Sequence, residues 1–163
     1  MCGIIGFTGN LQAPGILVDG LQQLEYRGYD SAGIAVNNGS ETKIVKTTGK
    51  VATLREKVEA AADLAGTCGI GHTRWATHGG VTEVNAHPHV SGNVTLIHNG
   101  IIENYKELAA SLKTKGFTAI SETDTEVAAM LIDSLYDGDP FAALKEADKV
   151  LEGAYGFCVM FKD

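Results

Sequence analysis

The sequence lacks the features of a membrane or nucleic-acid-binding protein. No apolar run approaches the roughly twenty residues of a membrane-spanning helix, and the first residues lack the basic segment and the apolar length of a signal peptide. Basic residues are too few to form a cluster: 13 Lys and Arg stand against 20 Asp and Glu, giving a net charge of −7. A surface that binds phosphate backbones needs such a cluster. We therefore expect neither a membrane nor a nucleic acid as partner.

Cysteine is also scarce. Cys2, Cys68 and Cys158 are odd in number and show no Cys-x-x-Cys spacing, which excludes a disulfide framework and a cysteine zinc finger. Unpaired thiols are typical of a reducing compartment, so we expect a cytoplasmic protein. The length of 163 residues and the hydrophobic content of 44% are those of one globular domain.

Hydrophobic periodicity and turn residues predict a mixture of strands and helices, which gives the α+β class. Strands are predicted at 3–8, 32–36, 43–47, 67–71, 94–98 and 154–161, and helices at 14–24, 51–61, 105–115, 123–135 and 141–151. Asn104 with Glu107, and Thr123 with Glu126, have the spacing of capping boxes. The stretch 73–92 has no period and is predicted to be a long loop, of the kind that forms lids and binding segments.

Cys2 is the first candidate for catalysis. A thiol becomes a strong nucleophile when a base removes its proton, and the nearest base would be the α-amine of Cys2 itself after removal of Met1. An α-amine has a pKa of about 7.7–8.0, which suits this role at neutral pH. Aminopeptidases readily remove Met before a residue as small as Cys. The alternative is a buried structural thiol at the edge of the first strand.

All five histidines fall within a short part of the chain: His72, His78, His87, His89 and His98. The His-x-His pair at 87 and 89 would suit a metal site, but no Cys or carboxylate stands at matching spacing, and Pro88 restricts the pair. We expect no metal and no cofactor. The histidines are instead expected on one loop and the strand after it, hydrogen-bonded to backbone groups.

Two pairs of polar residues suggest a binding site. Arg74 could clamp a carboxylate through two parallel hydrogen bonds, and Asp124, in the first turn of its predicted helix, carries the opposite charge. Together they would hold a small α-amino acid. The alternative is two unrelated surface charges, or an acid at a helix N-terminus with only a structural role. Asn99 and Gly100 follow a strand directly, and they would form either a two-donor oxyanion hole or a type I′ turn.

Two other features are ambiguous by themselves. The segment 27–33 contains two glycines among polar residues, but it lacks the ending of a P-loop and the spacing of a dinucleotide-binding motif. Trp75 is the only tryptophan and lies in the predicted long loop. It is either a local anchor for that loop or a lid residue that shields a reactive centre.

Six segments, taken in order, carry a resemblance to a known family. They are CGIIG at 2–6, YRGYDSAG at 26–33, HTRWATHG at 72–79, NAHPH at 85–89, HNGIIEN at 98–104 and SETDTE at 121–126. This set closely resembles the N-terminal glutaminase domain of the glucosamine–fructose-6-phosphate aminotransferases (isomerizing), or glucosamine-6-phosphate synthases. These enzymes are class II glutamine amidotransferases, which are N-terminal-nucleophile hydrolases. The resemblance extends over 2–163, nearly the whole chain.

The resemblance implies the αββα four-layer sandwich of that family and a role for each candidate residue. Cys2 would attack the side-chain amide carbon of glutamine, while Asn99 and the backbone N–H of Gly100 stabilise the oxyanion. Arg74 would bind the α-carboxylate and Asp124 the α-ammonium group of glutamine. The implied products are glutamate and ammonia. Further contacts with glutamine are implied for Arg27, Trp75, Thr77 and His78.

The resemblance also implies a larger assembly. In this family two sugar-phosphate isomerase domains follow the glutaminase domain and use the ammonia to convert fructose 6-phosphate to glucosamine 6-phosphate in hexosamine biosynthesis, within a homo-oligomer. No segment of this sequence corresponds to those domains, so we expect at most glutamine hydrolysis from this chain. The family's glutaminase domain continues with further strands, and we expect a domain truncated at its C-terminus, with exposed sheet edges.

Overall fold

The structure, a computed structural model, describes residues 2–162. Met1 and Asp163 lie outside the described residues, and so do the expectations that concern the removal of Met1 and the end of the chain. The elements are, in order, β1 (Gly3–Thr8), α1 (Ala13–Gln23), the 3-10 turn η1 (Glu25–Arg27), β2 (Ser31–Asn37), β3 (Thr42–Thr48), α2 (Val51–Ala60), β4 (Cys68–Arg74), β5 (His89–Ser91), β6 (Val94–Ile102), α3 (Tyr105–Thr114), α4 (Asp124–Leu135), α5 (Pro140–Asp148) and β7 (Gly153–Phe161).

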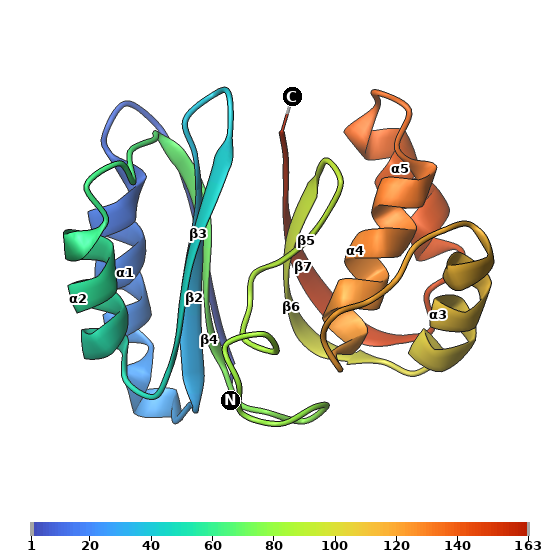
Figure 1. Cartoon of the computed structure of the whole chain (residues 1–163), viewed down its shortest axis with the longest axis horizontal. Coiled ribbons are helices and arrows are strands. Elements are labelled where there is room, and N and C mark those ends of the chain that lie inside the picture. Colours follow the sequence, from blue (N-terminus) through green and yellow to red (C-terminus); the bar gives the residue numbers. More distant parts are fainter. Residues whose placement is uncertain (1, 163) are drawn as a thin grey trace.

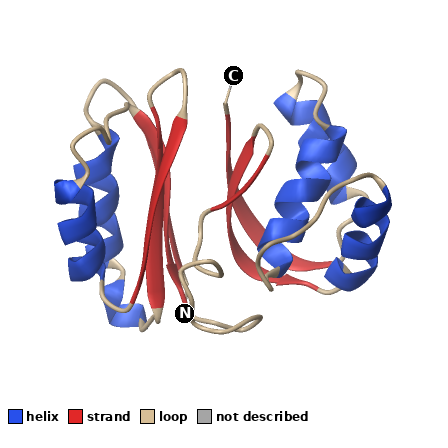
Figure 2. Ribbon diagram, viewed as in Figure 1, coloured by secondary structure: helices blue, strands red, loops and turns tan. Residues whose placement is uncertain are grey.

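These elements form four layers (Figures 1 and 2). Helices α1 and α2 cover the outer face of a sheet with the strand order β1-β4-β2-β3. A second sheet, of order β5-β6-β7, lies against the inner face of the first, and α3, α4 and α5 cover its other side. Every neighbouring strand pair is antiparallel. The expected αββα sandwich of the α+β class is confirmed.

The central strands are apolar on both faces because both faces are covered. In β2, Ile34 and Val36 pack toward α1 and α2, while the alternate residue Ala35 joins the core between the sheets. Successive side chains of a strand point to opposite faces of the sheet, so alternate residues of β2 enter the helix-covered core and the core between the sheets. The inter-sheet core is small and consists of Ala35, Ile70, Ile97 and Met160, with partly buried neighbours.

One end of the inter-sheet space is polar. Along β4 the residues that share the inner face change from Cys68 and Ile70 to His72 and then Arg74, and all four lie at alternate positions of one strand. On β6, Asn99 likewise follows Ile97 at the next position of the same face. Because the two faces become polar at the same end, the sandwich encloses polar side chains there.

The structure differs from the predicted elements around 73–92 and at Asn99. Strand β4 continues to Arg74 and β5 occupies His89–Ser91, so the stretch predicted as loop is partly strand. Strand β6 does not end in a turn at Asn99-Gly100 but continues to Ile102, because β7 pairs with it throughout. The type I′ alternative was therefore wrong.

Gly100 is required by the close pairing of β6 and β7. Its φ is 127°, a conformation that favours glycine. A Cβ atom at this position would lie 2.1 Å from the carbonyl oxygen of Ala154. The glycine therefore allows β6 and β7 to pair at this position, where a larger residue would collide with Ala154.

The two predicted capping boxes have different outcomes. The hydroxyl of Thr123 accepts a hydrogen bond from the N–H of Glu126 (3.2 Å), as expected for the N-cap of α4. The Glu126 carboxylate does not return the bond but accepts from the backbone N–H groups of Ile120 and Ser121. Asn104 does not cap α3; its amide bridges backbone groups of Val150 and Glu152. That interpretation was wrong because a tertiary contact takes the side chain.

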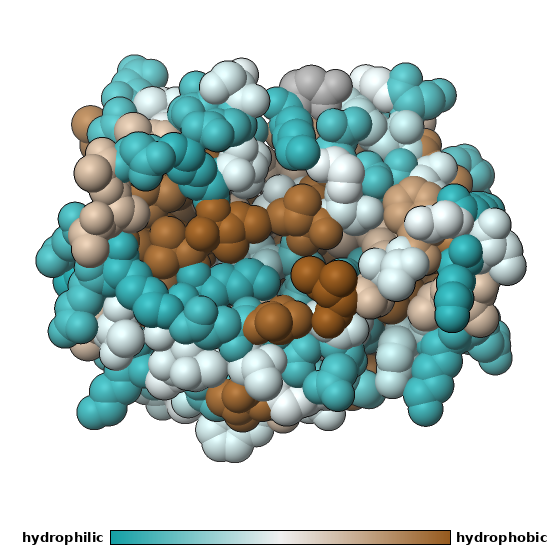
Figure 3. All heavy atoms as spheres, viewed as in Figure 1, coloured by the Kyte–Doolittle hydropathy of each residue, from teal (hydrophilic) through white to brown (hydrophobic). Residues whose placement is uncertain are grey.

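The surface is mixed, with hydrophobic side chains gathered near the middle of the face in Figure 3. No helix within 2–162 has the length and apolar character needed to cross a membrane. Among the described strands, β7 is at an edge of its sheet, next to β6 alone.

Candidate active site

A cavity of about 520 Å³ lies at the polar end of the inter-sheet space. All nine candidate residues from the sequence line it: Cys2, Arg27, Arg74, Trp75, Thr77, His78, Asn99, Gly100 and Asp124. Six further residues complete the lining: His72, His87, His98, Ile101, Thr123 and Thr125. The volume falls within the range of about 300–1,000 Å³ usual for small-molecule sites.

Strand pairing fixes the position of the Cys2 thiol. Gly3 pairs with Thr73 on β4, and the Gly3 N–H donates to the Thr73 hydroxyl (3.0 Å). Cys2 therefore lies beside the residues that follow β4, and the backbone N–H of Trp75 donates to its sulfur (3.2 Å). A donor at this distance stabilises a sulfur that carries negative charge.

The Asn99 side chain is held between two partners. Its Nδ2 donates to the carbonyl oxygen of Cys2 (3.2 Å), and its Oδ1 lies 2.9 Å from Nε2 of His72. The amide therefore stands beside the backbone of the candidate nucleophile. With the neighbouring Gly100 on the same cavity, it can supply hydrogen-bond donors to an oxyanion formed there.

The two opposite charges, Arg74 and Asp124, are both nearly buried, with 4% and 5% of their surface exposed. Asp124 begins α4, where the helix N-terminus stabilises a negative charge, and it accepts a bond from the N–H of Ile102 (2.9 Å). The burial of both residues contradicts the hypothesis of surface charges. The shared binding of an amino acid stays a prediction, and so does its alternative, in which Asp124 has only a structural role at the start of the helix.

The Arg74 guanidinium also orders the segment that follows it. It donates to the carbonyl oxygens of His78, Gly79 and Gly80. A guanidinium has five N–H donors. A carboxylate that enters the cavity would therefore share donors of Arg74 with these carbonyl oxygens, or replace the carbonyl oxygens as its partner. His78 packs edge-on against the Tyr105 ring, with the ring centroids 5.4 Å apart.

Trp75 lines the cavity and is 53% exposed. Its ring packs over Gly28, where a Cβ atom would lie 3.1 Å from the indole. The φ of Gly28 is 74°, so glycine suits both the backbone and the ring. Asp30 fixes the same loop, since its carboxylate accepts from the N–H of Ala76 (2.6 Å).

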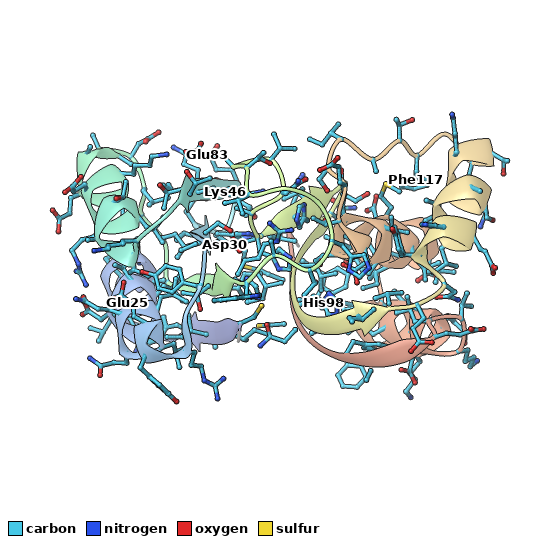
Figure 4. All side chains as sticks on the ribbon, turned by 90° about the horizontal axis from the view of Figure 1, so that it is seen from below. Glu25, Asp30, Lys46, Glu83, His98 and Phe117 are labelled. Carbon is cyan, nitrogen blue, oxygen red and sulfur yellow. The ribbon has the colours of Figure 1, made fainter. Side chains whose placement is uncertain are left out.

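Figure 4 shows Asp30 in the half of the molecule formed by the first sheet, and His98 in the other half.

Asn85 and Glu122 hold the far end of the loop, and we call this pair the latch. The Glu122 carboxylate accepts from the Gly80 N–H (3.1 Å) and from Asn85 Nδ2 (2.9 Å), while Asn85 Oδ1 accepts from the Glu122 N–H (3.0 Å). The hydrogen bond from Asn85 and that from Gly80 lower the pKa of Glu122. Gly79 makes this packing possible, because a Cβ there would lie 2.8 Å from Asn85 Nδ2.

Replacement of Glu122 by Ala is expected to loosen this loop and weaken substrate binding. The half-saturating substrate concentration should rise roughly ten-fold, since a misplaced positioning group can cost up to about 10²-fold. Steady-state kinetics of the variant measure this effect. The control is Glu107→Ala on the exposed surface of α3, which should leave the kinetics unchanged. An unchanged half-saturating concentration in Glu122→Ala would show that the latch does not order the site.

Four buried histidines form one cluster, and three of them line the cavity. They come from β4 (His72), the segment before β5 (His87), β5 (His89) and β6 (His98), and not from one loop and the strand after it. The rings of His72 and His87 stack with their centroids 4.1 Å apart. Thr125 Oγ1 lies 3.1 Å from His87 Nε2 and 3.0 Å from His98 Nδ1, and Thr123 Oγ1 lies 3.1 Å from His89 Nε2. The expectation of backbone partners is confirmed in part: the His98 N–H donates to Nδ1 of His87 (3.4 Å), and backbone groups of His98 and Asn85 bond to His72 and His89. Threonine hydroxyls from the start of α4 are the partners that it did not include.

Burial keeps this cluster uncharged. Loss of solvation lowers the pKa of His72 to about 4 and that of His89 to about 3. Burial holds the pKa of His87 well below its ordinary value, and unfavourable interactions of its charged form with the other histidines and with Arg74 lower it further. The pKa of His98 is also lowered by burial, although Asp124 opposes the shift. Within 2–162 no group of three or more His, Cys, Asp or Glu residues has the arrangement of a metal site.

Sequence reasoning missed His72, Asp30, Asn85 and Glu122 as parts of the site. Each contributes through a contact with a residue far away in the sequence, such as the pairing of His72 with Asn99. The clustering of five histidines was a signal of polar burial, but it did not identify their partners.

Comparisons with known proteins show the family and the fold of this chain. The pattern of the glutamine amidotransferase domain family matches residues 72–163, more than half of the chain. A glutamine–fructose-6-phosphate aminotransferase (isomerizing) from Thermus thermophilus is 53% identical over 165 residues, which covers all of this chain and 27% of that protein. The chain thus spans about a quarter of the length of this curated relative.

Two solved structures share the fold over 99% of this chain. The glutamine phosphoribosylpyrophosphate amidotransferase of B. subtilis, in complex with ADP and GMP, matches with a TM-score of 0.84 at 29% identity and over 35% of its own chain. A structure described as the allosteric regulatory enzyme of purine biosynthesis matches with a TM-score of 0.85 at 30% identity and over 36% of its chain. The family pattern, the relative and the shared fold agree, and this chain belongs to the glutamine amidotransferase domain family.

Proposed function

We propose that residues 2–163 form a type 2 glutamine amidotransferase domain that hydrolyses the side-chain amide of glutamine to glutamate and ammonia. One observation carries the proposal: a single cavity joins a thiol, oxyanion donors and a buried pair of opposite charges. An α-amino acid carries one charge of each sign, so the pair suits its main-chain groups. Its side chain would then extend toward the thiol.

The reaction follows from the placement of these groups. The Cys2 sulfur attacks the amide carbon, and the negative charge on the amide oxygen is stabilised by Asn99 Nδ2 and the N–H of Gly100. The proton of the thiol is transferred to the amide nitrogen, the C–N bond breaks, ammonia leaves and a γ-glutamyl thioester remains. Water then adds to the thioester carbon, the sulfur leaves as the thiol, and glutamate is released.

The other cavity residues bind the substrate. Arg74 would take the α-carboxylate and Asp124 the α-ammonium group. Thr77 and His78 come from the loop that Arg74 orders and would add contacts to the same end of glutamine. Arg27 and Trp75 would line the nucleophile side and exclude water when the loop is closed.

The proton transfer requires a base beside the sulfur. If residue 1 is removed, the α-amine of Cys2 is this base, since it belongs to the same residue and its usual pKa of about 7.7–8.0 lies near neutral pH. In a chain that retains residue 1, the same nitrogen is an amide without useful basicity. Activity is therefore expected only in the processed form.

In the whole protein, the ammonia would be used by further domains to convert fructose 6-phosphate to glucosamine 6-phosphate. The identity of 53% to an enzyme named for this sugar substrate supports the proposal. We further propose a cytoplasmic homo-oligomer; the cysteines Cys2, Cys68 and Cys158 are all free thiols, which suits a reducing compartment.

The proposal is tested by intact mass spectrometry after incubation with 6-diazo-5-oxonorleucine, an electrophile shaped like glutamine. The expected result is loss of residue 1 and a single adduct, which peptide mapping places on Cys2 and which excess glutamine suppresses. Processed protein that gains no adduct and releases no glutamate from glutamine would contradict the proposal. Binding of glutamine without turnover would instead identify a glutamine sensor.

A further inference from the structure

His72 is a buried histidine for which the reaction above has no use. It lies on the inner face of β4, none of its surface is exposed, and its ring stacks on His87. Its Nε2 atom lies 2.9 Å from Oδ1 of Asn99, the side chain proposed to bind the oxyanion. A histidine in this position can control that side chain directly.

The hydrogen-bond partners fix which way the Asn99 amide faces. One of its terminal atoms lies 3.2 Å from the carbonyl oxygen of Cys2. A carbonyl oxygen only accepts hydrogen bonds, so the facing atom has to be the donor Nδ2. The other atom, Oδ1, therefore faces His72, and because Oδ1 only accepts, Nε2 of His72 has to carry a proton.

This arrangement excludes the other neutral form of the ring. With its proton on Nδ1, His72 could only accept at Nε2, and Asn99 would have to turn over. Its oxygen would then face the carbonyl oxygen of Cys2, and two acceptors would repel each other. Burial keeps the ring neutral near neutral pH, so a single proton on Nε2 decides the orientation of the amide.

We propose that His72 is a positioning residue for glutamine hydrolysis, which holds the Asn99 amide with Nδ2 toward the reacting centre by donating from Nε2 to Oδ1. Nδ2 has two protons: one is directed to the Cys2 carbonyl and the other remains for the oxyanion. Donation to Oδ1 also polarises the amide and strengthens Nδ2 as a donor. The inference rests on the proposed glutaminase function.

The kinetic test is a double-mutant cycle in the full-length protein. His72→Leu is expected to lower kcat for glutamine roughly ten- to a hundred-fold, with KM changed by less than about three-fold. His72→Gln, whose side-chain NH₂ can reach the same oxygen, is expected to restore most of kcat. Asn99→Ala alone should lower kcat by roughly 10²–10³-fold. Adding His72→Leu to Asn99→Ala should cost little more, because His72 acts through Asn99.

The matched control is His89→Leu, which removes another buried histidine of the same cluster that bonds to Thr123 and not to Asn99. It should lower the melting temperature without lowering kcat by more than about three-fold. Fully additive losses of kcat in the cycle, or an equal loss in His72→Gln and His72→Leu, would overturn the proposal.

Nitrogen NMR of the wild-type protein tests the same assignment without relying on activity or on a variant that folds. At neutral pH the His72 ring is expected to be protonated on Nε2 and unprotonated on Nδ1. The opposite tautomer, or a charged ring, would overturn the proposal. If the wild-type protein fails to hydrolyse glutamine while this tautomer is found, the proposed function is wrong but the control of Asn99 by His72 stands.

Discussion

Replacement of Cys2 by Ala is expected to abolish glutamine hydrolysis, lowering kcat by roughly 10⁴-fold or more. Without the sulfur no thioester forms, and the oxyanion donors at Asn99 and Gly100 can only polarise an amide that nothing attacks. Glutamine should still bind, since Arg74 and Asp124 are untouched. Release of glutamate measures the first effect, and calorimetry with glutamine measures the second.

The control for this variant is Cys158→Ala. Cys158 lies on β7, away from the cavity lining, and burial together with the neighbouring Cys68 raises the pKa of its thiol. A buried thiol of raised pKa is a poor nucleophile, so this variant should retain hydrolysis and the adduct on Cys2. Substantial turnover by Cys2→Ala would remove Cys2 from the mechanism.

The second large effect expected is a loss of stability in acid. The pKa of His72 is lowered to about 4 and that of His89 to about 3, against about 6.5 in the unfolded chain. Between these values the unfolded chain binds protons that the folded protein does not, so the free energy of unfolding falls as the pH falls. The stabilisation is complete above pH 6.5 and is lost progressively toward pH 4 and then pH 3.

The expected loss of unfolding free energy in acid is large relative to the total free energy of unfolding of an ordinary domain. Each histidine that charges only in the unfolded state removes about 1.4 kcal/mol per pH unit, so the shift at His72 alone corresponds to on the order of 3 kcal/mol. With several buried histidines, the loss by pH 4 approaches the 5–15 kcal/mol that a domain of this kind usually has. Urea unfolding at pH 7, 6, 5 and 4.5 measures it.

The histidine contribution can be separated from that of carboxylates. His89→Gln removes one titrating group, so its unfolding free energy should change less steeply with pH, by close to one proton, whatever its stability at pH 7. A free energy of unfolding that is constant from pH 7 to 4.5 would show that the cluster is hydrated or already charged.

Some features could be predicted from local sequence alone. The strands and helices followed from apolar spacing, and the N-cap at Thr123 from a threonine placed three residues before an acid. The errors arose where a distant segment determined the local structure. Asn99-Gly100 has a turn sequence, but β7 pairs with it and keeps it extended, and Asn104 has a cap sequence, but backbone groups beside α5 bind its amide.

The sequence by itself determined the family, the candidate nucleophile Cys2 and eight further residues of its cavity, because these are encoded in six short, contiguous segments. Only the tertiary structure decided how they are held. The contact of His72 with Asn99 and the latch that joins Asn85 to Glu122 connect residues 27 and 37 positions apart. Arg74 and Asp124 are buried at the same cavity although 50 positions separate them. Strand register and sheet packing set such contacts, and neither is visible in local spacing.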